Sequence, residues 1–284
     1  MHKKPKNIFI PHPIFGWLLS PNSQIQVSHR ENVIQNIDNN GNRTVPKLIK
    51  NNHCAKLNVY GCSFTYGTGL TDDETYPAII QKHTPHLSIC NKGIGGHSTV
   101  QNYLRFRDDL KNNNVDMAIF GVISDHRYRN IAHPYRMKQH QSSGWVSIGT
   151  DKVPHIKINR NKNAEIVYTN TLQPCLKNAD ISSFLPNEYF IDLSTLWIFD
   201  EIIKLSQIHD IPVIIAILDK LDPIFTDLML TKFQHAVDVS TPLDQNHTFM
   251  PVDIHPNHIA NQIFANGILK KMNESKQWLN ACEK

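Results

Sequence analysis

A serine follows a predicted strand at a point where a strand can present a nucleophile. The segment Leu57–Tyr60 has residue types that favour a strand, and Gly61 permits the sharp turn that would follow it. Ser63 would then lie at the carboxyl end of that strand, where ligands bind in open α/β sheets. A Gly-x-Ser sequence is also found in ordinary turns, so the partners of Ser63 decide whether it is a nucleophile.

A carboxylate and an imidazole lie together near the other end of the chain, at Asp253 and His255. In this spacing the carboxylate can orient the ring and stabilise the imidazolium that forms when the histidine accepts a proton. An Asp-x-His pair is also ordinary surface chemistry. Pro256 suits the start of the helix predicted over 258–272, because an N–H in the first turn has no intrahelical partner to lose.

A glycine-rich segment, Gly93–Thr99, follows the predicted strand Leu87–Lys92 and precedes a predicted helix that ends near Leu110. Ser98 or Thr99 can cap this helix, and the backbone N–H groups at its start suit an anion or a developing oxyanion. The glycines do not have the spacing of a dinucleotide-binding motif, and the Lys-Ser/Thr pair of a phosphate-binding loop is absent.

The apolar run Val115–Ile123 predicts a strand that is buried on both faces. The polar segment Ser124–Asn130 follows it directly. Many ionisable groups at the carboxyl end of a buried strand indicate a functional site, and a salt-bridged surface turn is the alternative.

The remaining pattern alternates between strands and helices. We expect a helix over 191–208 and strands over 212–218 and 236–239, which favours a parallel sheet with helices on both faces. The acidic segment Thr71–Glu74 resembles a helix start. From about 131 to 187 the periodicity fades, which predicts an insertion, a small β element folded over the site. Residues 1–54 predict an N-terminal extension that packs on the core.

The composition is that of an ordinary globular chain of 284 residues, long enough for one large α/β domain with an insertion. The net charge of +4 is mild and the basic residues are scattered, so no nucleic-acid partner is expected. The sixteen histidines form no His-Glu-x-x-His motif, and the chain has no Cys-x-x-Cys motif. We therefore expect no metal.

The cysteines are odd in number and widely spaced, which suits reduced thiols and predicts a cytoplasmic location. They are Cys54, Cys62, Cys90, Cys175 and Cys282. The basic N-terminus lacks the apolar region of a signal peptide. No run approaches the roughly 18 apolar residues of a membrane-spanning helix, so no membrane span is expected.

Taken in order, these segments resemble the SGNH (GDSL-type) hydrolase superfamily over about residues 55–128 and 190–275. The extension resembles one branch of it, through the pieces Gly16-Trp17, Pro21-Asn22 and Gly41-Asn42-Arg43. The resemblance implies a flavodoxin-like three-layer α/β/α domain over 55–284, with a parallel central sheet and no cofactor. It also implies hydrolysis or transfer of an acyl ester.

The resemblance assigns roles to individual residues. Ser63 is implied as the nucleophile, His255 as the general base that later protonates the leaving alcohol, and Asp253 as its orienting partner. The backbone N–H groups of Ser63 and Gly96 are implied as oxyanion donors.

The chain departs from the family pattern in two places. The usual Gly-Asp-Ser is replaced by Gly61-Cys62-Ser63, which leaves the nucleophile in place. The Gly-x-Asn-Asp block is replaced by the segment 121–126, which lacks the Asn that completes the oxyanion hole. His126 can donate a hydrogen bond in its stead, with Asn130 and Arg127 as alternatives. Ionised Asp125 would oppose the developing charge.

The implied function is that of a serine esterase that removes an acetyl or other short acyl group from a small molecule or a glycan. An O-acyltransferase that uses the same triad is one alternative. A catalytically degenerate carbohydrate-binding protein of the same fold is the other, because the fold alone does not determine the chemistry.

Overall fold

A five-stranded parallel sheet forms the centre of the molecule. The structure is a computed structural model that describes residues 8–46, 53–142, 148–159, 161–173, 180, 182, 185–275 and 278. The sheet order is β11 (Ala236–Thr241), β10 (Val213–Asp219), β7 (Met117–Val122), β5 (Ala55–Gly61) and β6 (Leu87–Gly93). Counted along the chain this is the order 2-1-3-4-5 of flavodoxin-like sheets, so the expected fold class is confirmed.

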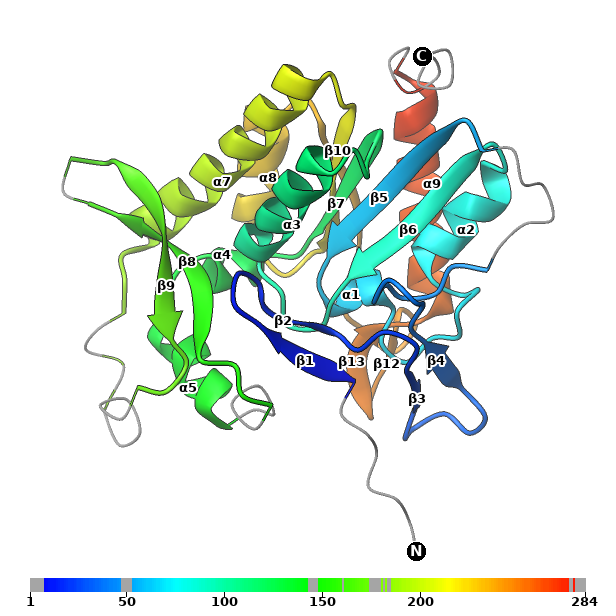
Figure 1. The fold of residues 1–284 in the computed structure, drawn as a ribbon, viewed down its shortest axis with the longest axis horizontal. Coiled ribbons are helices and arrows are strands. Elements are labelled where there is room, and N and C mark those ends of the chain that lie inside the picture. The colour runs from blue at the N-terminus through cyan, green and yellow to red at the C-terminus, as the bar shows by residue number, and fades with distance from the viewer. Residues whose placement is uncertain are drawn as a thin grey trace, which may run out of the picture.

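Helices cover both faces of this sheet (Figure 1). One face carries α3 (Thr99–Lys111), α7 (Glu188–His209) and α8 (Pro223–Lys232). The other carries α2 (Tyr76–His83) and α9 (His258–Asn273). The resulting three layers are the α/β/α sandwich that the alternating sequence pattern predicts, although α8 is an additional helix.

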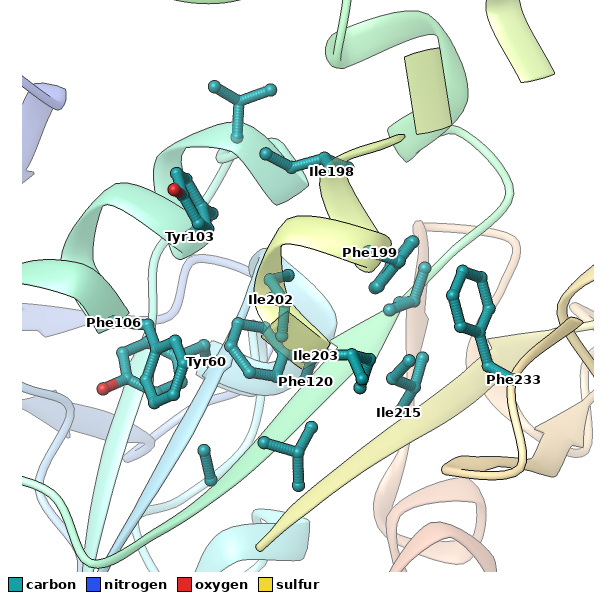
Figure 2. Close-up of a cluster of buried hydrophobic side chains, with 14 of the residues drawn as sticks. Tyr60, Tyr103, Phe106, Phe120, Ile198, Phe199, Ile202, Ile203, Ile215 and Phe233 are labelled. Atoms are coloured by element: carbon teal, nitrogen blue, oxygen red, sulfur yellow. The ribbon is translucent and has the colours of Figure 1, made fainter. Parts of the chain in front are cut away.

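Strand β7 shows why the central strands are apolar at every position. Phe120 points into the cluster under α3 and α7, where its ring lies 5.1 Å from that of Tyr60 and 5.5 Å from that of Phe106 (Figure 2). Its neighbour Ile119 belongs to the cluster under α2 and α9. Successive side chains alternate between the faces, so both faces must be apolar.

The N-terminal extension forms two small antiparallel hairpins against the core. The first pairs β1 (Phe9–His12) with β2 (Gly16–Leu19), and the second pairs β3 (Gln24–Gln26) with β4 (Ile34–Asn36). Arg43 N donates to Asn91 O at 3.1 Å, which attaches the end of the extension to β6.

The acidic segment before α2 has a role other than the one its sequence predicts. Asp72 forms an ion pair with buried Arg43, and Glu74 forms one with Arg30. Helix α2 therefore begins only at Tyr76, with Thr75 as its N-cap. The carboxylates hold the extension instead of opening the helix, which sequence spacing within 71–74 could not reveal.

The insertion contains α5 (Pro134–Ser142) and a hairpin of β8 (Lys152–Ile158) and β9 (Ala164–Asn170). Strand β8 packs against α3, α7 and β2. The β element of the expectation is present, and Val153 of β8 shares an apolar cluster with Trp17 of the extension and Ile94 of the glycine-rich loop.

Two further sequence expectations can be compared with the structure. Cys54 is disulfide-bonded, whereas Cys62 and Cys90 are free. The expectation of reduced thiols is therefore wrong at Cys54, and the cysteine pattern no longer favours the cytoplasm, because disulfides persist in oxidising compartments. Across the described part of the chain, no helix is long and apolar enough to cross a membrane.

Several histidines are buried where the insertion meets the core. Burial is the main cause that lowers the pKa of His155 to about 3 and that of His140 to about 4. Both pKa values lie below the ordinary 6.5. As the pH falls below 6.5, these rings therefore take up protons in the unfolded chain but stay neutral in the folded protein. Their contribution to stability is complete above pH 6.5 and is lost as the pH falls toward the folded pKa values.

We expect acid sensitivity that depends on His155. Between pH 7 and pH 5 the wild-type protein should lose about 2 kcal/mol more unfolding free energy than His155→Gln, because one buried histidine no longer resists protonation. Urea denaturation at both pH values measures this difference. Exposed His86 provides the control, since His86→Gln should retain the wild-type pH dependence. Parallel pH profiles for wild type and His155→Gln would contradict the assignment.

Candidate active site

Helix α1 (Ser63–Tyr66) lies directly on the ends of three strands, and glycines make this approach possible. A Cβ atom at Gly61 would lie 2.7 Å from Thr65 Cβ. One at Gly121 would meet Thr65 Oγ1 of α1 and would also lie 2.6 Å from the Tyr76 hydroxyl. A Cβ atom at Gly93 would lie 2.6 Å from the Thr65 carbonyl carbon. Any side chain at these strand ends would push α1 away from the sheet, so the glycines determine where Ser63 lies.

Ser63 is the first residue of α1, and Cys62 before it is the fully buried N-cap. The turn is held by Tyr66 N, which donates to Cys62 O at 2.9 Å, and by Asn91 Nδ2, which donates to Thr65 O at 2.9 Å. Ser63 itself is partly exposed, and its hydroxyl has no hydrogen-bond partner among the described residues. The fold thus fixes the backbone of Ser63 and leaves its side chain available.

The predicted Asp-His pair lies on β13 (Asp253–Pro256), which pairs with β12 (Thr248–Phe249). Asp253 Oδ1 lies 2.6 Å from His255 Nδ1 and accepts from His255 N at 3.0 Å. Burial raises the pKa of Asp253, but these hydrogen bonds outweigh it and hold the pKa below its ordinary value. The ionised carboxylate accepts the Nδ1 proton, which leaves Nε2 of the neutral ring as the basic atom.

The position of His255 connects this pair to Ser63. Its ring contacts that of Phe64, the residue after Ser63, with a centroid separation of 5.8 Å. Figure 1 shows α1 and β13 at the same end of the sheet. Two segments about 190 residues apart in sequence are therefore neighbours at the carboxyl ends of the strands, as binding sites of this fold class are.

A second Asp-His pair shows that the contact alone does not define the site. Asp244 Oδ1 lies 2.7 Å from His247 Nδ1 in the turn before β12. Among the described residues, however, the ring contact with the Ser63 turn belongs to His255. Pro256 also differs from expectation, because it ends β13, and Asn257 caps α9 by accepting from Ile259 N at 2.9 Å.

The glycine-rich loop is fastened to the Ser63 turn. Ile94 N donates to Gly61 O at 3.1 Å, and Ser98 begins α3 with a capping box that includes Gln101. Gly96 has a φ of +80°, a left-handed conformation that strains any other residue. Its N–H group finds no acceptor among the described residues, so it is a free donor in this loop.

Two of the three candidate third donors are engaged elsewhere. Asn130 accepts from Thr99 N at 3.0 Å and donates to Thr195. Arg127 forms ion pairs with acidic residues of α7 and the start of α8, namely Glu188, Asp192 and Asp222. The ion pairs of Arg127 agree with the alternative interpretation of the segment Ser124–Asn130, in which its charged residues form salt bridges.

His126, the first choice, is fully buried beside the glycine-rich loop. Its Nδ1 lies 3.3 Å from Thr99 Oγ1, and its Nε2 has no hydrogen-bond partner among the described residues. Burial, together with Arg129, lowers the pKa of His126 well below the ordinary value, so the ring is neutral.

Sequence reasoning missed two residues that shape this region. Asp219, at the end of β10, accepts from Ser124 N and Oγ at distances of 3.1 to 3.2 Å and so fixes the turn after β7. Trp17, for which the sequence predicts only a place in an extension that packs on the core, contacts the glycine-rich loop through its indole N–H. Both contacts join residues that are far apart in sequence, so local spacing does not reveal them. For Asp219, the one clue in the sequence is an acidic residue at the end of an apolar strand.

No metal-binding cluster occurs among the described residues.

Comparisons with known proteins give similarity of shape at low identity. No family model and no curated protein matches the chain. A protein assigned to the G-D-S-L lipolytic family from Desulfitobacterium hafniense is 13% identical, with 76% of this chain and 98% of that chain covered and a TM-score of 0.44. A psychrotrophic esterase from Pseudoalteromonas is 10% identical, with 80% of this chain and 99% of that chain covered and a TM-score of 0.41. An acetyl xylan esterase is 16% identical, with 76% of this chain and 98% of that chain covered and a TM-score of 0.40.

The first of these proteins is described as a member of the G-D-S-L family, and the other two are described as esterases. At such identities and TM-scores they do not assign an activity to this chain. The function is therefore inferred from the chain's own residues.

We expect Gly93→Ala to displace α1 and lower the unfolding free energy by about 3 kcal/mol, because the added methyl group would meet backbone atoms that cannot move aside. Chemical denaturation measures the loss. Gly95→Ala is the matched control, since its Cβ would lie 3.6 Å from Phe9 Cζ and needs no rearrangement. Equal stability of the two variants would contradict the close approach of α1.

Proposed function

We propose that the protein is a serine esterase that hydrolyses a short-chain acyl ester through an acyl-enzyme on Ser63. One observation carries the proposal: the Asp253–His255 hydrogen bond of 2.6 Å lies beside the start of α1, where the Ser63 hydroxyl is free of described partners. A nucleophile from α1, and a base and an orienting carboxylate from β13, are the parts that acyl transfer needs.

The proposed reaction begins when Ser63 Oγ attacks the ester carbonyl carbon and His255 Nε2 takes the hydroxyl proton. His255 returns this proton to the departing alcohol, which leaves an acyl group on Ser63. Water then attacks the acyl-enzyme with His255 again as the base, and the carboxylic acid departs. Asp253 stays ionised throughout and stabilises the imidazolium.

The proposed oxyanion hole starts with two backbone donors, the N–H groups of Ser63 and Gly96. Ser63 N lies at the start of a helix, where an N–H group has no intrahelical acceptor. Gly96 N–H has no acceptor among the described residues. Fixed donors of this kind stabilise the negative oxygen of the tetrahedral intermediate without reorganising.

His126 is the proposed third donor. If Thr99 Oγ1 donates its proton to Nδ1, the ring proton must reside on Nε2. A buried N–H group without an acceptor is unfavourable unless a ligand uses it. The engagement of Asn130 and Arg127 in other contacts supports this choice.

The proposed substrate is a short acyl ester of a small molecule or a glycan, as the sequence resemblance implies. An O-acetylated sugar is the first substrate to test. Transfer to a sugar hydroxyl instead of water would give an acylated product when an acceptor is added, and product analysis separates the two reactions.

We expect wild-type protein to hydrolyse p-nitrophenyl acetate and to react with a fluorophosphonate probe. Ser63→Ala should lower the hydrolysis rate by at least about 10⁴-fold and abolish labelling, because the nucleophile is removed. Ser98→Ala, which alters a helix cap, is the control for serine reactivity and should still be labelled. Equal hydrolysis by wild type and Ser63→Ala would refute the nucleophile. An unlabelled wild type with retained glycan binding would favour the degenerate binding protein.

Replacing His126 tests the third donor. His126→Phe keeps an aromatic ring and should lower kcat about 100-fold with little change in KM, because the lost contact forms only as charge develops. His133→Phe replaces another buried histidine and should keep the wild-type kcat. Steady-state kinetics on folded variants, checked by circular dichroism, give the comparison. A wild-type kcat for His126→Phe would refute the role of His126 and leave the N–H groups of Ser63 and Gly96 as the proposed donors.

A further inference from the structure

Trp17 connects the N-terminal extension to the glycine-rich loop by a hydrogen bond from its side chain. Trp17 lies on β2, is fully buried, and belongs to a small apolar cluster with Tyr66 and Ile94. Its indole Nε1–H donates to Gly95 O at 3.0 Å. Trp17, which is far from Ser63 in sequence, is thus hydrogen-bonded to the peptide unit that contains the N–H group of Gly96.

Trp17 also holds the other side of Gly96. His97 Nε2 lies 3.0 Å from Trp17 O, and because a carbonyl oxygen can only accept, Nε2 carries the proton. Burial, together with Arg105, lowers the pKa of His97 well below the ordinary value, which keeps this ring neutral. Gly96 therefore lies between two residues that are both hydrogen-bonded to Trp17.

The geometry of a trans peptide relates the first of these bonds to the Gly96 N–H group. The C=O and N–H of one peptide unit lie in a plane and point in opposite directions. Since Gly95 O points at the Trp17 indole, Gly96 N–H points away from it. The hydrogen bond from Ile94 N to Gly61 O holds this loop beside the Ser63 turn. Within the loop, Gly96 has a left-handed φ of +80°.

The strand that carries Trp17 is itself anchored at two points. Gln101 Nε2 on α3 donates to Phe15 O at 2.7 Å. Thr150 Oγ1 of the insertion donates to Gly16 O at 3.0 Å. Both bonds lie next to Trp17 in sequence, so the tryptophan is held from the core and from the insertion.

We propose that Trp17 is a positioning residue that fixes the Gly95–Gly96 peptide with its N–H directed at the oxyanion. The inference rests on the proposed esterase function and deepens it, because it makes the N-terminal extension part of the catalytic apparatus. Without the indole N–H the peptide can rotate, and the donor is lost at the moment the charge develops.

Trp17→Phe tests this role, since it keeps an aromatic ring in the cluster and removes the donor. Tyr60→Phe is the control, because it also removes buried hydrogen bonds, and these lie away from the loop. Tyr60 OH donates to Asp109 at 2.6 Å and accepts from Asn58 Nδ2 at 3.1 Å. For both variants we would measure thermal unfolding, kcat and KM with p-nitrophenyl acetate, and the rate of fluorophosphonate labelling.

We expect Trp17→Phe to lower kcat and the labelling rate at least about 10-fold with KM within twofold of wild type, and Tyr60→Phe to keep the wild-type kcat. A crystal structure of Trp17→Phe should show the Gly95–Gly96 peptide rotated. If wild type reacts and Trp17→Phe behaves like Tyr60→Phe, only the positioning role is refuted. If wild type neither hydrolyses esters nor reacts with the probe, the proposed function itself fails.

Discussion

The close approach of α1 to the ends of three parallel strands is the constraint on which the rest of this structure depends. Glycines at 61, 93 and 121 leave no side chain between the sheet and the first helical turn. The helix can therefore begin immediately after β5, which places Ser63 at the rim of the sheet with its backbone held and its hydroxyl without a hydrogen-bond partner among the described residues. A Cβ atom at any of these positions would require α1 to move.

The N-terminal extension contacts several loops around this turn. Arg43, buried and paired with Asp72, secures the loop after α1, and its guanidinium lies 5.3 Å from the Tyr66 ring centre. Trp17 secures the loop that contains Gly96. Arg30, which donates to Gly69 O at 2.8 Å, lies over the Phe249 ring next to β13. These segments near Ser63 thus have contacts from the extension, which restrict the motion of loops that would otherwise be flexible.

Part of the candidate site was predictable from the sequence, because its signals are local. Gly61 and Ser63 are two residues apart, as are Asp253 and His255, so their spacing is visible before folding. The structure bears out the Asp-His contact itself, while the roles of the three residues remain proposals. The choice among His126, Asn130 and Arg127 could not be made from sequence, since it depends on partners 27 to 95 residues away.

The layered α/β/α class follows from the sequence pattern, because alternating apolar strands and amphipathic helices can bury their faces in few other ways. The same pattern predicts which segments end at the carboxyl edge of the sheet. In contrast, the ion pairs of Asp72 and Glu74 with arginines of the extension, and the hydrogen bond from Trp17 to Gly95, are visible only in the folded chain. Contacts between distant segments leave no periodic pattern in the sequence, so local spacing cannot predict them.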